Sequence, residues 1–329
     1  MQPFDREPQT AIPPPPPSVE TRTAAESTGA VADGLRALSQ SVVPPEDPWR
    51  LEVERQDKRA VRYDEIHELT LPIYRAYEDW ITEAIYSAWY EVRGRVLLVG
   101  CGTGAQLQRL SLRMPAKLLT AIDLAPEMTR RAREKVPSTI EVRTIPFDRF
   151  MPSVPFDTIA FTGSLAAMPD LRAVCEHAAK MTVLGSRLVV CAANGEWEYS
   201  DPAKRGSARM LYPSWYWHRL LNRTQLARVA SLQAAVPPSP HAELTPSRIA
   251  TGFEARFGLR DLKTDFGITR LFEDVVAIDP RAALKTVGPT RETRPYMRTI
   301  DGLKKLDASF ARQKPDRGGL MAMLFDRLR

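Results

Sequence analysis

A short apolar run ends in a turn with three glycines near residue 100. Residues 96–99 read Val-Leu-Leu-Val, and the turn that follows reads Gly-Cys-Gly-Thr-Gly over residues 100–104. Apolar residues followed by glycines predict a buried strand that runs into a tight turn, because glycine lacks a Cβ and tolerates backbone angles closed to other residues. This pattern restricts the chain to folds in which a strand, a turn and a helix hold a ligand against bare backbone.

A carboxylate closes the next apolar run. Residues 118–122 read Leu-Leu-Thr-Ala-Ile, and Asp123 follows them. A carboxylate at the end of the second strand can accept hydrogen bonds from both hydroxyls of a ribose. The glycine turn and Asp123 together predict a site for an adenosine-containing cofactor.

Strands and helices alternate with short connections beyond residue 95. This alternation favours an α/β fold with an open, doubly wound, mostly parallel sheet that is covered on both faces. We expect strands at 95–99, 118–123, 140–145, 156–162, 187–192, 259–267 and 319–325. We expect helices at 51–62, 63–90 with a break at Pro72, 105–113, 126–135, 171–181 and 298–312.

Composition excludes several classes of protein. No apolar run approaches the roughly 20 residues that a membrane span requires, and the N-terminus lacks the apolar stretch of a signal peptide. The three cysteines have no metal-ligand spacing, so we expect no metal site and a reducing cytoplasm. The formal charge of +6 is compatible with an anionic partner or with solubility alone.

Two kinds of adenosine cofactor fit the turn. Residues 100–105 satisfy the dinucleotide pattern G-x-G-x-x-A as well as G-x-G-x-G, and Asp123 suits an NAD site. However, a dinucleotide domain begins with its fingerprint strand, whereas here an aromatic helical stretch precedes the strand. We therefore rank an NAD-dependent oxidoreductase last.

Four motifs in register resemble those of the class I S-adenosylmethionine-dependent methyltransferases, in particular the small-molecule group that includes the quinone C-methyltransferases. They are the glycine turn, Asp123, the Phe-Asp strand at 156–162 and the run Gly-Ser-Arg-Leu-Val-Val at 185–190. The resemblance covers about residues 63–192 and implies a seven-stranded Rossmann-like methyltransferase fold. The implied cofactor is S-adenosyl-L-methionine.

The resemblance also implies roles for single residues. Backbone at Gly100, Cys101 and Gly102 would line the methionine and ribose part of the cofactor, and Asp123 would bind the ribose hydroxyls. The remaining cofactor-binding residues would be Leu124, Met128, Phe147 and Asp148 around the adenine, Gly163, Ser164 and Leu165 beside the sulfonium, and Tyr63 in an N-terminal lid.

Three positions depart from the family pattern. Leu98 replaces an acid that anchors the methionine amino group, and a second lid aromatic would fall near Thr70. Ala166 and Ala167 stand where relatives often carry histidine. These departures bear on cofactor affinity and on the identity of a base, and they leave the fold prediction intact.

We divide the chain accordingly. Residues 1–47 are interpreted as a disordered tail, because ten of the 28 prolines lie in residues 1–50. Residues 48–329 form the methyltransferase domain: a helical lid at 48–94, a cofactor-binding core at 95–195, an insertion at 200–245 and the C-terminal part of the sheet at 246–329.

The predicted function is methyl transfer to a small-molecule acceptor that is aromatic or lipophilic. An acceptor that is protonated at working pH needs a base. We name His218, in an aromatic cluster of the insertion, and His67, in the lid, as hypothetical catalytic residues.

A non-catalytic binding or scaffold protein is the alternative function. A nucleic-acid methyltransferase ranks lower, because Gly-Ser-Leu-Ala at 163–166 replaces the Asn/Asp-Pro-Pro-Tyr type of motif. The sequence leaves the oligomeric state open.

Overall fold

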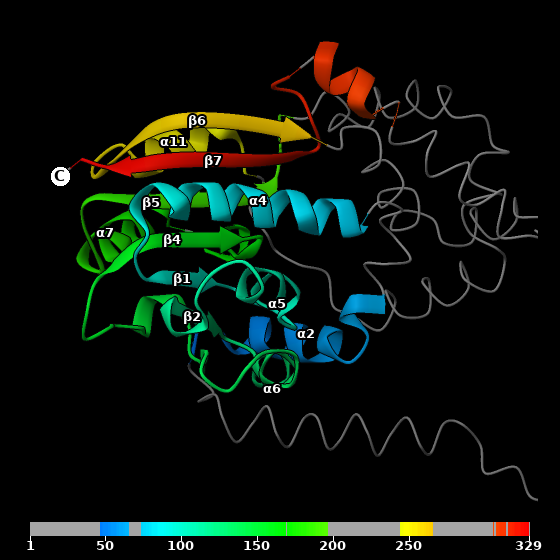
Figure 1. Ribbon diagram of the computed structural model, residues 1–329, viewed down its shortest axis with the longest axis vertical. Helices are drawn as coiled ribbons and strands as arrows, with labels where there is room; N and C mark the ends of the chain where they lie inside the picture. Colours follow the sequence, from blue (N-terminus) through cyan, green and yellow to red (C-terminus); the bar gives the residue numbers. More distant parts are fainter. Residues whose placement is uncertain are drawn as a thin grey trace, which may run out of the picture.

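The computed structural model describes residues 47–65, 74–168, 170–196, 244–265, 305, 307–313 and 315–328. Within these residues a seven-stranded sheet runs through the centre of the fold in the order β3-β2-β1-β4-β5-β7-β6 (Figure 1). The strands are β1 Val96–Val99, β2 Leu119–Asp123, β3 Glu141–Thr144, β4 Phe156–Thr162, β5 Thr182–Ala193, β6 Phe257–Asp265 and β7 Leu320–Arg327. The first five strands are parallel, and β7 pairs antiparallel with β5 and β6. This is the doubly wound, mostly parallel sheet that the sequence predicts.

Helices cover both faces of the sheet. They are α2 Arg50–Ala60, α4 Tyr74–Val92, α5 Ala105–Ser111, α6 Pro126–Lys135, α7 Leu171–Lys180 and α11 Pro246–Phe253. On one face Ile81 and Ile85 of α4 pack in a cluster with Leu98 of β1. On the other face Leu97 of β1 shares a cluster with Phe253 of α11. Neighbouring residues of β1 thus enter opposite cores, which explains why the run at 96–99 is apolar throughout.

The helices begin where the sequence supplies a suitable first turn. The carboxylate of Asp170 accepts hydrogen bonds from the backbone N–H groups of Arg172 and Ala173, both at 3.0 Å, and so caps α7. The hydroxyl of Thr245 caps α11 in the same way, and Pro246 follows it. A proline, Pro126, also opens α6, where its missing N–H leaves no helical bond unmade.

Two elements differ from the sequence prediction. β5 begins at Thr182 and passes through Gly185, which has a φ of +83°. The prediction starts this strand at Arg187, because glycine and serine interrupt the apolar pattern before it. Helix α11 was not predicted, although Thr245 and Pro246 carry the signals of a helix start. The helix predicted over 298–312 is helical at residues 305 and 307–313.

Some predictions fall outside the described residues. They concern the tail at 1–46, the insertion as far as residue 243, and His67, Thr70 and His218. In the described part of the chain, no helix is both long enough and apolar enough to cross a membrane. The same part contains no group of three or more His, Cys, Asp or Glu residues arranged to hold a metal ion.

Candidate functional site

A cleft opens at the carboxyl ends of β1, β2 and β4. In open α/β sheets ligands bind at this edge, where the strand order reverses between β1 and β4. The cavity volume of this cleft is about 130 Å³. The cleft is lined by Trp49, Glu52, Gln56, Arg59, Tyr63, Val99, Gly100, Gly102, Ile122, Asp123, Leu124, Met128, Ile145, Pro146, Phe147, Thr162, Gly163, Ser164, Ala167 and Met168.

The glycine turn presents bare backbone to this cleft. Gly100, Gly102 and Gly104 all have positive φ, between +53° and +88°. At Gly100 a Cβ would lie 2.3 Å from the Cβ of Ser164, so only glycine fits there. The Ser164 hydroxyl donates to the carbonyl of Val99 at 2.7 Å and thereby joins the end of β4 to the turn.

Asp123 is fixed in place by backbone donors. One carboxylate oxygen accepts from the N–H of Gly102 at 2.9 Å, and the other accepts from the N–H of Ala125 at 3.0 Å. The side chain is 9 % exposed. Burial raises the pKa of Asp123 to about 6 against the lowering effect of those N–H groups. The carboxylate therefore lies beside the turn, as the sequence motif predicts.

The residues expected around the adenine are divided between the cleft and its surroundings. Leu124, Met128 and Phe147 line the cleft. Phe147 also packs edge-on against Phe161 in the core, with ring centres 5.1 Å apart. Asp148 does not line the cleft, and its carboxylate accepts from the indole N–H of Trp49 at 3.2 Å.

The residues expected near the sulfonium are divided as well. Gly163 and Ser164 line the cleft, whereas Leu165 is fully buried in the core below it. Cys101 does not line the cleft, and burial raises the pKa of its thiol well above the usual value, so this side chain packs as a small apolar group.

The N-terminal wall of the cleft contains residues that the sequence analysis missed. Trp49, Glu52, Gln56, Arg59 and Tyr63 all line the cleft, and of these only Tyr63 was predicted. They recur every three or four residues, so they form one face of α2 and its flanking turns. The aromatic carbon Cε1 of Tyr63 lies 4.0 Å from the position that a Cβ on Gly102 would take. The spacing of this stripe is the signal that could have revealed the wall.

Comparison with known proteins bears on the first part of the sheet. Residues 96–185, from β1 into β5, match the family model described as a methyltransferase domain. This match supports a class I methyltransferase core, and such a domain implies S-adenosylmethionine as the methyl donor. No curated protein matches the chain.

Solved structures give weaker likenesses. The N-methyltransferase NodS from Bradyrhizobium japonicum WM9, in complex with S-adenosyl-L-homocysteine, is 14% identical with a TM-score of 0.44, and the match covers 90% of this chain and 99% of NodS. The plantazolicin methyltransferase BpumL, in complex with a desmethyl plantazolicin analogue and the same product, is 16% identical with a TM-score of 0.44. That match covers 92% of this chain and 99% of BpumL. Because both TM-scores are below 0.5, these two structural matches support no conclusion beyond the one that the observed strand order already gives.

Proposed function

We propose that the cleft binds S-adenosylmethionine and that the protein transfers its methyl group to a small, aromatic or lipophilic acceptor. The observation that carries this proposal is the arrangement at the switch point of the sheet. There a buried carboxylate, Asp123, and the bare backbone of the glycine turn lie in one cleft. Such a site suits a nucleoside with a charged sulfonium tail, because the turn leaves its backbone uncovered. The turn depends on glycine, since a Cβ at Gly100 would collide with Ser164.

The chain's own residues would divide the work of binding. The carboxylate of Asp123 accepts from the ribose hydroxyls, and the backbone of Gly100 and Gly102 approaches the methionine part. Leu124, Met128 and Phe147 supply apolar contacts for the adenine. Gly163 and Ser164, after β4, border the reacting end. All of these residues line the cleft.

Catalysis would rest on position. When bound, S-adenosylmethionine would supply a methyl group that its sulfonium already activates, and S-adenosylhomocysteine would be the product of its transfer. The protein aligns the acceptor with that methyl group and excludes water. The α2 wall, from Trp49 to Tyr63, covers the cleft and suits the second task.

The proposal of an apolar acceptor rests on the residues after β4. Ala167 and Met168 line the cleft there, and the usual histidine is replaced by Ala166 and Ala167. Small apolar side chains leave room for a planar or lipophilic group. The assignment to the quinone C-methyltransferase-like group rests on the sequence resemblance and not on these two residues.

A base for the acceptor remains a hypothesis with two candidates. His218 and His67 belong to the insertion and to the lid expected over the cleft. If either removes the acceptor's proton, its replacement by alanine should lower kcat by about 100-fold or more with little change in cofactor affinity. Turnover at the wild-type rate in both variants would exclude both residues.

Calorimetry with S-adenosylhomocysteine tests the cofactor site. We expect the wild type to bind, and we expect Asp123→Ala to weaken binding by at least about tenfold, because it removes hydrogen bonds to a charged acceptor. Asp261→Ala, which removes an exposed carboxylate on β6, is the matched control and should bind as the wild type does.

A non-catalytic binding or scaffold protein is the second candidate. Leu98 favours it, since this residue is fully buried in the core and the acid expected there is missing. Absence of S-adenosylhomocysteine binding at millimolar concentration would support the scaffold and contradict the methyltransferase proposal.

A further inference from the structure

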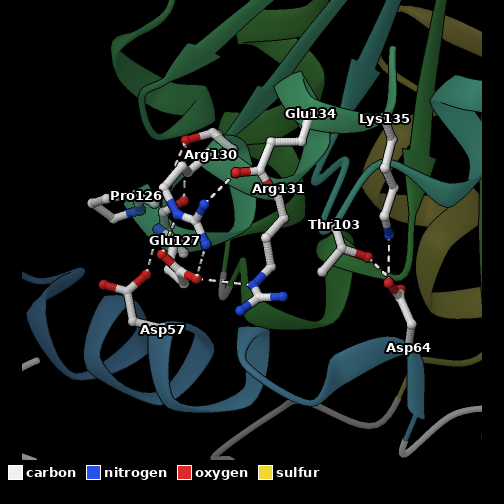
Figure 2. A network of polar contacts seen from close by, with 11 residues as sticks. Asp57, Asp64, Thr103, Pro126, Glu127, Arg130, Arg131, Glu134 and Lys135 are labelled. Atoms are coloured by element: carbon white, nitrogen blue, oxygen red, sulfur yellow. Dashed lines mark hydrogen bonds and ion pairs between the residues drawn. The ribbon is translucent and has the colours of Figure 1, made fainter. Parts of the chain in front are cut away.

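The α2 segment, residues 47–65, contributes one wall of the cleft, and its helix lies beside α6 (Figure 1). The apolar cluster that it shares with α6 is small: Ala60 and Tyr63 meet Leu124, Ala125 and Met128. Trp49, at the other end, packs against the main core. At the Tyr63 end, ionic and hydrogen-bonded contacts add to the attachment. Figure 2 shows two of them, made by Asp57 and Asp64.

Asp57 joins the α2 segment to the start of α6. Its carboxylate accepts from the backbone N–H of Glu127 at 2.9 Å, and the side chain is 6 % exposed. Helix α6 begins after Ala125, which has no side-chain acceptor to satisfy the first N–H groups. Asp123 takes the N–H of Ala125, so Asp57 and the proposed ribose ligand share one helix start.

The negative charge of the Glu127 carboxylate, which repels that of Asp57, is balanced by two arginines. Arg130 and Arg131, one turn further along α6, both donate hydrogen bonds to the Glu127 carboxylate. These arginines hold the Glu127 side chain on α6, while the backbone N–H of Glu127 donates to Asp57 (Figure 2).

Asp64 joins the other end of the α2 segment to the glycine turn. One of its oxygens accepts from the hydroxyl of Thr103 at 2.5 Å, and the other pairs with the ammonium of Lys135. Thr103 lies between Gly102 and Gly104 and is 2 % exposed, and Lys135 is the last residue of α6. Asp57 therefore contacts the start of α6, and Asp64 contacts the last residue of α6 and the glycine turn.

We propose that Asp57 and Asp64 form a latch that holds the α2 wall over the cleft and limits how fast the nucleoside leaves it. Both act as positioning residues. Neither lines the cleft, but the residues between and beside them, Gln56, Arg59 and Tyr63, do. Release of the latch frees the Tyr63 end of the wall. The Trp49 end keeps its contacts through Asp148 and through the ion pair of Asp47 with Arg149.

This inference rests on the proposed function for the identity of the ligand, and the first measurement uses that ligand. In Asp57→Ala and Asp64→Ala, we expect S-adenosylhomocysteine to dissociate at least about tenfold faster in stopped-flow experiments, with little change in association rate. Lys135→Met cuts the Asp64 contact from the body side and should act in the same direction. It also replaces Asp64→Ala if that variant fails to fold.

Glu54→Ala is the matched control. Glu54 is a carboxylate on the same helix, and its ion-pair partner, Lys58, is also on α2. Alanine raises helix propensity at all three sites, and it does so more when it replaces aspartate than when it replaces glutamate. A change in propensity alone would therefore stabilise the segment and does not account for faster release in the latch variants. We expect this variant to release the ligand at the wild-type rate.

The second measurement needs no ligand. Hydrogen exchange of α2 amides in the unliganded protein should be faster in the latch variants than in Glu54→Ala, while exchange in β1 and β4 stays unchanged. Wild-type dissociation and wild-type α2 exchange in folded latch variants would overturn the latch. If the wild type binds no S-adenosylhomocysteine but the variants still loosen α2, the cofactor proposal fails and the role of the contacts in holding α2 stands.

Discussion

The carboxylate of Asp123 is buried beside α6, where it accepts from the backbone N–H groups of Gly102 and Ala125. Burial raises its pKa to about 6, and the nearby carboxylate of Glu52 contributes to this rise. The two N–H groups therefore offset only part of the cost of the buried charge. Perturbed carboxyl groups in clefts are typical of functional sites.

Replacing this charge should therefore separate stability from binding. In Asp123→Asn the neutral amide avoids the burial penalty and keeps one oxygen acceptor. We expect a melting temperature at pH 7.5 equal to or above that of the wild type, together with at least about tenfold weaker binding of S-adenosylhomocysteine. A large drop in melting temperature would contradict this account. Differential scanning fluorimetry and calorimetry provide the two measurements.

The same carboxyl predicts a pH dependence of stability. Its folded pKa of about 6 lies above the ordinary value of 3.8, so the folded state binds the proton more tightly between these values. This group's contribution to the free energy of unfolding should then fall as pH rises from about 4 to 6. The melting temperature of Asp123→Asn minus that of the wild type should increase over this window and level off above it. A difference independent of pH would exclude a raised pKa at Asp123.

At the scale of single elements, the glycine turn determines how closely α6 can approach β1. Gly104 has a φ of +88°, and a Cβ there would lie 2.8 Å from the Cα of Ala132 on α6. Because that neighbour is backbone, it cannot rotate away. The close approach of turn and helix thus depends on a missing side chain.

Two glycine variants distinguish the cost of a steric clash from the cost of a left-handed backbone. Gly185 also has positive φ, but a Cβ there would meet nothing within 4 Å. We expect Gly185→Ala to lower the free energy of unfolding by about 1 kcal/mol through the left-handed backbone alone. Gly104→Ala should lower it by about 3 kcal/mol, since a steric clash adds to the same strain. Urea unfolding measures both changes, and equal losses would rule out the clash.

The sequence predicted the elements whose signals are local. β4 and α6 have the predicted bounds, Phe156–Thr162 and Pro126–Lys135. A mostly apolar run between Pro155 and Gly163 marks the strand, and a first-turn proline marks the helix. Helix α11 was missed because its apolar face is only two turns long and follows a proline-rich stretch. The early start of β5 at Thr182 depends on pairing with Phe156 of β4, which no local pattern records.

The part of the candidate site that lies at the ends of neighbouring strands could be predicted from the sequence. Gly100, Gly102 and Asp123 end neighbouring strands, so their meeting follows from the parallel sheet. The stripe of Glu52, Gln56 and Arg59 could not be recognised in the same way, because polar residues at helical spacing also describe a solvated helix face. Asp148 was assigned by resemblance, whereas its contact with Trp49 joins residues 99 positions apart.

For the whole molecule, the α2 segment adds a layer outside the sheet and its covering helices. It packs on α6 and the turn through a small apolar cluster, and Trp49 packs against one of the two main cores, which lie between the sheet and the helices α4, α5, α7 and α11. The cleft depends on this outer layer for one wall.

Two truncations test this division. A chain that begins at residue 46 should keep the melting temperature and the S-adenosylhomocysteine affinity of the full chain, because it retains Asp47, which pairs with Arg149, and lacks only residues interpreted as a tail. A chain that begins at residue 66 should keep the cooperative unfolding of the sheet but lose affinity by at least about tenfold, since the wall from Trp49 to Tyr63 is gone. Equal affinity in both chains would show that α2 does not contribute to binding.

The position of β7 affects how the chain can fold during synthesis. β7 follows all the other strands in sequence but lies between β5 and β6 in the sheet. On the ribosome, where N-terminal segments emerge first, residues 257–265 emerge before residues 320–327, the strand with which they pair in the described sheet. Until then the nascent chain exposes the edge of β5, and an unpaired edge recruits foreign strands. Chaperone demand should therefore peak late in translation.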